Sequence, residues 1–334
     1  MAGIFGDEER VFNHYLELPF ELRTMVIDEM EVDDRCRFTQ CSNMCCEEAK
    51  KSKKYLYGFK LICWSEDLLT IEIKHGNNED DALGQGFVLT YLSNLERKVE
   101  KCVSLASNAT LWEDELDNSV DLFQRAMEYL QKRMRDCEHS LKKLCLDGLI
   151  WTGHTKLLKN VNFGIERLEN LEELDIRGDI DALQIFSKLQ LPLKKLYVED
   201  NVLSSQLPDL KNIYQVQEEL NCWNLKLNVQ HFLRLRAKLV FIRIGELTEK
   251  DIFKFVRSWQ NGTIGKNIEV YQWDLRDSNF SKKTLLRFFR INDSESGPIE
   301  IKHHRKAGKS AVLLFDDRIL RFNANLVEDS VFQR

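Results

Sequence analysis

Residues 18–30 read LPFELRTMVIDEM and have the features of a helix start. Pro19 lacks an N–H and has a fixed φ, so it suits the first turn of a helix and not its interior. Glu21 then places an acidic group near the positive end of the helix dipole. The apolar side chains that follow recur at helical spacing and are Leu22, Met25, Val26, Ile27 and Met30. This segment therefore predicts a helix near the start of the chain.

Two further short helices are predicted directly after it. Asp33 and Asp34 can cap a helix that carries Phe38, and a third helix around Met44 runs into the basic residues 50–54. Three helices of this size cannot bury all of their apolar side chains among themselves. They form either the first helical layer of a larger domain or a docking module whose spare face is buried against another protein.

Residues 14–54 also resemble an F-box, closest to the variants found in large nematode families. The resemblance rests on residues 18–23, 33–35 and 40–42, whereas residues 43–46 read NMCC where many F-boxes have an aromatic side chain. An F-box implies binding to a Skp-type adaptor and, through it, to a cullin. The residues that the resemblance assigns to adaptor binding are Leu18, Pro19, Leu22, Arg23, Val26, Met30 and Cys41.

The composition predicts a globular protein. Of the 334 residues, 43% are hydrophobic and 31% are charged, which supplies a sizeable core. The net charge of −6 disfavours nucleic acid and anionic membranes as partners, and no apolar run is long enough to span a bilayer. The odd number of cysteines, 9, and the absence of a signal-like start lead us to expect reduced thiols and a cytoplasmic or nuclear location.

The second half of the chain repeats an apolar-x-x-apolar-x-apolar pattern. It is clear at residues 141–146, 171–176 and 193–198, and weaker copies lie at 216–222, 239–244 and 268–273. Successive copies are separated by about 20 to 30 residues, and helix-like stretches at 180–186 and 250–256 lie between them. A short strand plus a helix at this spacing predicts an irregular leucine-rich-repeat-like α/β horseshoe. The alternative is an ordinary α/β domain with leucine-rich strands.

In a horseshoe of this kind each strand turns alternate side chains toward a concave surface that can bind a protein. Asp147 belongs to this outward set. The residues that we predict to contact a substrate protein are Asp175, Arg177, Tyr197, Glu199, Trp223, Arg243, Gln272 and Asp274.

Other elements follow from local patterns. Residues 55–64 and 68–74 are β-branched and aromatic and predict strands, while residues 87–106 mix Leu, Val and Lys at helical spacing. Residues 112–116 are undecided. A helix capped near Asp117 would have an apolar face of Val120, Phe123, Met127 and Leu130.

The C-terminal part carries a second resemblance. Residues 253–262 read FKFVRSWQNG and are similar to a segment of nematode F-box-associated domains, and residues 269–273 follow as a strand. Residues 299–302, 310–315 and 319–322 resemble the closing β-meander of that domain. Found in this order behind an F-box, the two resemblances imply the substrate receptor of an SCF-type (Skp adaptor, cullin, F-box) ubiquitin ligase.

No motif for catalysis, phosphate binding or cofactor binding is present, so we expect neither enzymatic activity nor a cofactor. The cysteine cluster at Cys36, Cys41, Cys45 and Cys46 has the wrong spacing for a structural zinc site, and we expect no metal. Buried thiols on packed helices account for these residues better.

The chain is thus predicted to be an α/β protein with a flexible tail at 1–13, an F-box at 14–54 and a leucine-rich-repeat-like substrate-binding domain at 55–334. Its predicted function is to hold a target protein for ubiquitination and degradation. The alternative is a stand-alone binding module, for instance a stoichiometric inhibitor or an antidote that neutralises a toxin. The resemblance to a fast-diversifying nematode family implies foreign or selfish proteins as targets.

Overall fold

The computed structural model describes Tyr15, residues 17–30, 34, 37, 38, 41, 42, 44, 45 and 48, and residues 56–65, 67–75, 86–94, 97–136, 141–148, 165–178, 189, 192–199, 211–222, 229–243, 247–264, 267–275, 279–291, 298–304, 309–316 and 318–324. These residues form an α/β protein whose strands are numbered β1 to β14. The chain divides into unit 1, Met1–Leu144 with Arg167–Asn170, and unit 2, Cys145–Glu166 with Leu171–Arg334. The division falls inside β6 (Lys143–Gly148), so residues 14–54 and residues 55–144 belong to the same unit.

Unit 1 begins with the predicted helix, α2 (Phe20–Glu29). Pro19 is its N-cap residue, and Glu21 lies in its first turn as expected. The helix ends where Met30 adopts an extended conformation, with φ −62° and ψ 139°. Helical backbone also occurs at the described positions 34, 37, 38, 41, 44, 45 and 48, in the region predicted to hold two more helices.

A small apolar cluster holds this helical segment together. Tyr15, Ile27, Phe38 and Cys45 are buried in it, and the rings of Tyr15 and Phe38 meet edge to face with their centroids 5.4 Å apart. A cluster of this size buries only one side of α2. The remaining apolar side chains of the helix therefore stay outside it.

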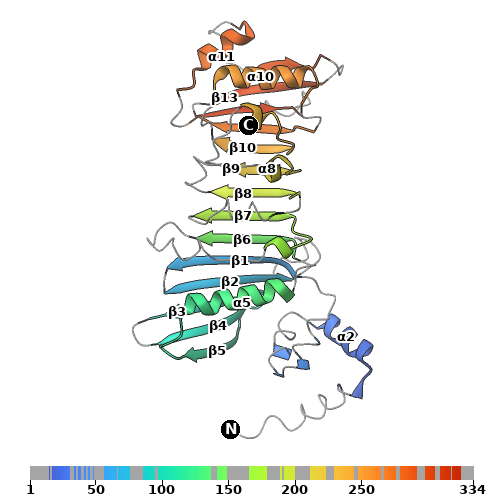
Figure 1. Cartoon of the computed structure of the whole chain (residues 1–334), viewed down its shortest axis with the longest axis vertical. Helices are drawn as coiled ribbons and strands as arrows, with labels where there is room; N and C mark the ends of the chain where they lie inside the picture. The colour runs from blue at the N-terminus through green and yellow to red at the C-terminus, as the bar shows by residue number, and fades with distance from the viewer. Residues whose placement is uncertain are drawn as a thin grey trace. The chain divides into compact units, whose positions relative to one another are not determined.

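The rest of unit 1 is an antiparallel meander in which each strand pairs with the next. Its strands are β1 (Leu56–Ser65), β2 (Leu68–His75), β3 (Gly86–Ser93), β4 (Lys98–Ser104) and β5 (Thr110–Leu116). Leu61, Ile71, Leu89 and Cys102 lie opposite one another and are buried. The helix α5 (Leu122–Asp136) packs on β2 and β3 (Figure 1).

The helical pattern predicted over residues 87–106 is wrong, because these residues form β3 and β4. Phe87, Leu89 and Tyr91 are buried while Val88 and Thr90 between them are only partly buried, which is the period of a strand. A short run of Leu and Val fits both the helical period and the strand period, and tertiary packing decides between a helix and a strand.

The other predictions for unit 1 agree with the structure. The strands at 55–64 and 68–74 are confirmed as β1 and β2, and the undecided residues 112–116 lie in β5. The helix predicted after Asp117 is α5, in which Met127 and Leu130 are buried as expected. Val120 precedes the first residue of that helix.

Unit 2 contains five parallel strands in register, β7 (Glu173–Gly178), β8 (Lys195–Glu199), β9 (Glu219–Cys222), β10 (Leu239–Arg243) and β11 (Val270–Asp274). The register aligns buried residues across all five, namely Leu174, Leu196, Leu220, Val240 and Tyr271. The strands predicted from the repeated pattern, β6 among them, are confirmed. In β10 the aligned residue is Val240.

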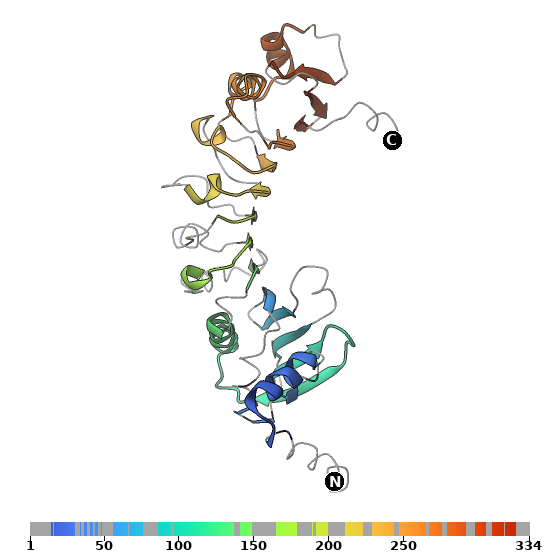
Figure 2. The same ribbon diagram turned by 90° about the vertical axis from the view of Figure 1, so that its right-hand side faces the viewer.

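Helices lie on one side of these parallel strands (Figure 2). They are α8 (Lys211–Tyr214), α9 (Val229–Phe232) and α10 (Glu249–Gln260), and a short 3-10 helix, η1 (Ile165–Arg167), precedes β7 in the chain. The helix predicted at 250–256 is confirmed as α10, which starts with a capping box between Thr248 and Asp251. Phe255 of α10 contacts the rings of Phe232, Tyr271, Trp273 and Phe322, with centroids 4.8–5.6 Å apart.

The predicted C-terminal β-meander is confirmed as β12 (Ile299–Lys302), β13 (Ser310–Asp316) and β14 (Ile319–Asn323). These strands are antiparallel, and β14 also pairs with β11, so the sheet of unit 2 is mixed. The helix α11 (Lys282–Phe289) lies between β11 and β12 in the chain and starts where Ser281 accepts a hydrogen bond from the Thr284 N–H, at 3.2 Å.

Some predictions fall on residues outside those described, namely the tail at 1–13, the helix at 180–186, Trp223, and Cys36 and Cys46. No helix within the described ranges combines the length and the apolar character needed to cross a membrane.

Candidate functional site

The helical segment of unit 1 exposes an unusual number of large apolar side chains. On α2 the exposed fraction is 39% for Phe20, 46% for Leu22, 61% for Met25 and 40% for Val26, and Met44 beyond the helix is 42% exposed. Only Trp64, Leu92 and Phe288 are comparable in the rest of the described chain. Exposed apolar side chains that gather on one helix mark a binding surface more often than chance exposure does.

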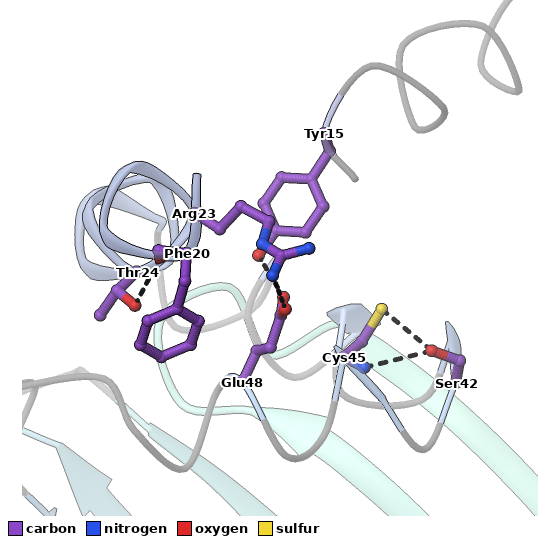
Figure 3. Close-up of polar contacts among 7 residues, drawn as sticks. All are labelled: Tyr15, Phe20, Arg23, Thr24, Ser42, Cys45 and Glu48. Atoms are coloured by element: carbon purple, nitrogen blue, oxygen red, sulfur yellow. Dashed lines mark hydrogen bonds and ion pairs between the residues drawn. The ribbon is translucent and has the colours of Figure 1, made fainter. Parts of the chain in front are cut away.

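A buried polar network fixes α2 to the residues that follow it (Figure 3). The Glu48 carboxylate accepts a hydrogen bond from the Tyr15 hydroxyl at 2.8 Å and pairs with the Arg23 guanidinium at 3.1 Å. Glu48 is buried, and a buried carboxylate is tolerated only when it is paired in this way. Burial, followed by the hydrogen bond to Glu48, raises the pKa of Tyr15.

A second local contact positions Cys45 in the cluster. The Ser42 hydroxyl accepts a hydrogen bond from the Cys45 N–H at 3.1 Å and donates to its Sγ at 3.2 Å (Figure 3). This is a side-chain cap at the start of a helical turn. The Cys41 thiol donates to the Arg37 carbonyl at 3.4 Å, and partial desolvation raises the pKa of that thiol.

The residues predicted to bind an adaptor fall into two groups, one packed within the helical segment and one exposed. Leu18 and Met30 pack against the apolar cluster, and Arg23 is paired with Glu48, so these three residues support the fold of the segment. Four others are exposed, namely Pro19, Leu22, Val26 and Cys41. The predicted adaptor-binding set did not include Phe20, Met25 and Met44, which are also exposed. The exposure of Phe20 and Met25 depends on which side of α2 faces the cluster.

In unit 2, the side chains between the buried positions form a row on the other face of the sheet. Strand register places six of them side by side across β7, β8, β9, β10, β11 and β14, namely Asp175, Tyr197, Asn221, Phe241, Gln272 and Arg321. We call this set the outward row. It brings together three of the predicted substrate-binding residues, Asp175, Tyr197 and Gln272.

Ion pairs and hydrogen bonds order both ends of the outward row. At one end Arg177 donates from Nε and Nη2 to the two oxygens of Asp175, at 3.0 and 2.7 Å. The hydrogen bond to Asp175 raises the pKa of the Arg177 guanidinium. At the other end the Arg321 guanidinium donates twice to the Gln272 carbonyl oxygen, at 3.1 and 2.8 Å.

The middle of the outward row contains a polar atom that lacks a hydrogen-bond partner within the described part of the chain. The Asn221 Oδ1 atom is buried and has no hydrogen-bond partner among the described residues. Tyr197 and Phe241 are half-buried on either side of it, and burial followed by a hydrogen bond to Glu219 raises the pKa of Tyr197. The two half-buried aromatic rings offer apolar surface for a partner to cover.

The remaining predicted substrate residues are placed differently. Glu199 is exposed beside this row, whereas Asp274 is buried and does not present its carboxylate to a partner. Trp223 and the side chain of Arg243 lie outside the described part of the chain.

Three residues of the outward row were missed from the sequence. Asn221 and Phe241 could have been found, because each lies between two buried positions of its strand, as Asp175 does in β7. Arg321 could not, since β14 is placed beside β11 by a long-range antiparallel pairing that leaves no local signal.

Within the described residues, no three His, Cys, Asp or Glu side chains gather closely enough to hold a metal ion. No known protein family, curated protein or solved structure matches the chain.

Proposed function

We propose that the chain is the substrate-recognition subunit of an SCF-type ubiquitin ligase, in which residues 14–54 bind a Skp-type adaptor and unit 2 binds a target protein. The observation that carries this proposal is the apolar surface of α2, which lies on the segment that resembles an F-box. The outward row supports the second half of the proposal, because it offers a long and mostly polar surface on regular strands.

The adaptor would cover Leu22 and Val26 together with Phe20 and Met25. Fully burying one large apolar side chain contributes about 1.5–3 kcal/mol, and each of these is already about half-buried. Covering all four would therefore contribute roughly 4 kcal/mol before the costs of association. The Tyr15, Arg23 and Glu48 network would hold α2 in place for this contact.

The role of unit 2 in this proposal is to bring a target lysine close to a charged ubiquitin-conjugating enzyme. The ligase would then accelerate transfer by raising the effective concentration of the two reactants, without chemistry from this chain. Parallel strands with helices on one side are consistent with a leucine-rich-repeat-like horseshoe, which we include in the proposal. Repeat proteins of this kind bind partners along the surface that their strands line.

A pull-down with a purified Skp-type adaptor tests the first half. We expect Leu22→Asp with Val26→Asp to abolish adaptor binding, because two carboxylates would be desolvated in the interface. The circular dichroism spectrum should not change, since both positions are exposed. The matched control is Trp64→Asp with Leu92→Asp, which replaces exposed apolar residues in the strands of the same unit. Equal loss of binding in both variants would contradict the proposal.

A separate pair of changes tests the second half. Tyr197→Ala with Phe241→Ala removes the two aromatic rings beside Asn221 and is expected to weaken capture of the target protein. Adaptor binding should be unaffected. Retention of every co-purifying target by this variant would remove the outward row from the proposal.

The second candidate function is that of a stoichiometric binder that masks its partner, for instance an antidote to a toxin. It is favoured by the compactness of unit 2, which buries apolar side chains of its own strands and of α10. The two functions differ in one cellular measurement. A ligase receptor lowers the level of its target in a proteasome-dependent manner, and a masking protein does not.

A further inference from the structure

Helices α10 and α11 carry a concentration of positive charge. Within their bounds are six basic residues, and Arg290 follows as the C-cap of α11. Their only two acidic residues are Glu249 and Asp251, both in the first turn of α10. The whole chain has a net charge of −6, so the charge balance of these two helices is opposite in sign to that of the chain.

Both acidic residues are already engaged. Glu249 accepts a hydrogen bond from the Ser281 N–H at 2.5 Å, and Asp251 closes the capping box with Thr248 and lies 4.0 Å from Lys254. By contrast, no carboxylate among the described residues lies within ion-pair distance of the exposed Arg287 and Arg290 side chains. Arg287 lies in the last turn of α11, and Arg290 is the C-cap residue of that helix, with a left-handed backbone (φ 59°, ψ 36°).

An aromatic contact runs beside these arginines. Phe288 is the only large apolar side chain of unit 2 that is exposed within the described ranges, at 37%. Its ring stacks on Phe253 of α10 with a centroid distance of 5.4 Å and an angle of 25°, and the Arg257 guanidinium covers Phe253 at 5.2 Å. The ring of Phe288 is therefore held in place while part of it faces solvent.

We propose that this basic face, defined by Phe253, Arg257, Arg287, Phe288 and Arg290, docks an acidic segment of a partner protein. Neighbouring side chains on the same side of an extended peptide are about 7 Å apart. Two carboxylates on one side of the segment would pair with Arg287 and Arg290, the exposed cations at the C-terminal end of α11. An apolar residue of the segment would cover the exposed part of Phe288. This inference does not depend on adaptor binding by α2.

A protein segment fits better than nucleic acid. Single-stranded nucleic acid is bound by a succession of stacking aromatic rings along a basic groove. Here one exposed ring is already stacked on Phe253, and α11 is only about 12 Å long.

Fluorescence anisotropy with the full chain tests the proposal. The probe is a labelled peptide of about eight residues in which glutamate alternates with other residues and one of these is phenylalanine. The comparison peptide has glutamine in place of every glutamate. We expect the glutamate peptide to bind about tenfold more tightly, and its affinity to fall as salt is added.

Variants locate the binding. Arg287→Glu with Arg290→Glu should weaken binding of the glutamate peptide by about tenfold or more, and Phe288→Ala by about threefold. The matched control is Arg167→Glu with Arg236→Glu, which makes the same change in net charge at two exposed arginines elsewhere. It should leave the affinity within about twofold, since distant exposed charges are screened. If the reversed variant does not fold, Arg287→Gln with Arg290→Gln replaces it.

Three results would overturn the proposal. The first is equal affinity for the glutamate and glutamine peptides. The second is the same loss of affinity in the α11 variant and the control, which would mean that net charge alone matters. The third is tighter binding of a single-stranded RNA than of the peptide, lost in the α11 variant, which would make the face a nucleic-acid surface.

Discussion

Removal of the Glu48 carboxylate should unfold the helical segment without affecting unit 2. This carboxylate is 8% exposed and contacts Tyr15 at 2.8 Å and Arg23 at 3.1 Å. Breaking a buried ion pair by removing one partner costs about 3–5 kcal/mol, and the 19% exposure of Arg23 reduces this to about 2–3 kcal/mol. Segments of this size are marginally stable, so such a loss should populate the unfolded segment.

Hydrogen exchange measured by mass spectrometry reports this loss locally. In Glu48→Ala, amides of α2 should exchange about 30- to 140-fold faster than in the wild type, the factor that corresponds to 2–3 kcal/mol. Amides of β7 to β11 should be unchanged. The matched control is Asp34→Ala, which removes a 64% exposed carboxylate 3.7 Å from Arg37 and should cost less than about 0.5 kcal/mol. Similar exchange of α2 in both variants would refute the reasoning.

Three further predictions concern stability. Gly86→Ala should destabilise unit 1 by about 3 kcal/mol in urea unfolding, because its φ is +146° and an added Cβ would lie 1.9 Å from a backbone oxygen. The control Gly58→Ala, in which the added Cβ has a nearest contact of 3.3 Å, should cost less than about 1 kcal/mol. Equal costs in the two variants would contradict this prediction. Trp259→Ala should cost about 3–5 kcal/mol, and the half-exposed Trp64→Ala about 1 kcal/mol at most, with reversal of that order as the contradicting result. Burial raises the pKa of Tyr271, so the contribution of this residue to folding stability is fully present below its unfolded pKa of about 10 and is lost as the pH rises above that value. Tyrosinate absorbance of Tyr271 should therefore appear together with the loss of circular dichroism. Ionisation of Tyr271 in a still folded protein would argue against this prediction.

The elements that sequence predicted well have strong local determinants. Pro19 and the apolar spacing after it locate α2, and the repeated apolar pattern locates β6 to β11. These features depend on backbone geometry and on burial of one face, both of which are encoded over a few residues. The failure at 87–106 shows the limit, because Leu and Val fitted two periods and only pairing with β2 selected strands.

The candidate surfaces were predicted less completely, for a physical reason. Whether a residue of α2 is exposed depends on how the helix rotates against Tyr15 and Phe38, so Met30 was expected at the surface and packs against the cluster. Likewise, Arg321 reaches Gln272 only through the pairing of β14 with β11. Long-range register of this kind cannot be read from one segment.

The central claim is adaptor binding by α2, and affinity purification from the native cells with mass spectrometry tests it most directly. The wild-type chain is compared with Leu22→Asp with Val26→Asp, and with the control Trp64→Asp with Leu92→Asp. We predict that a Skp-type adaptor and a cullin co-purify with the wild type and the control and are lost from the α2 variant, while target proteins remain bound to all three. Absence of both adaptor and cullin from the wild-type sample would contradict the claim.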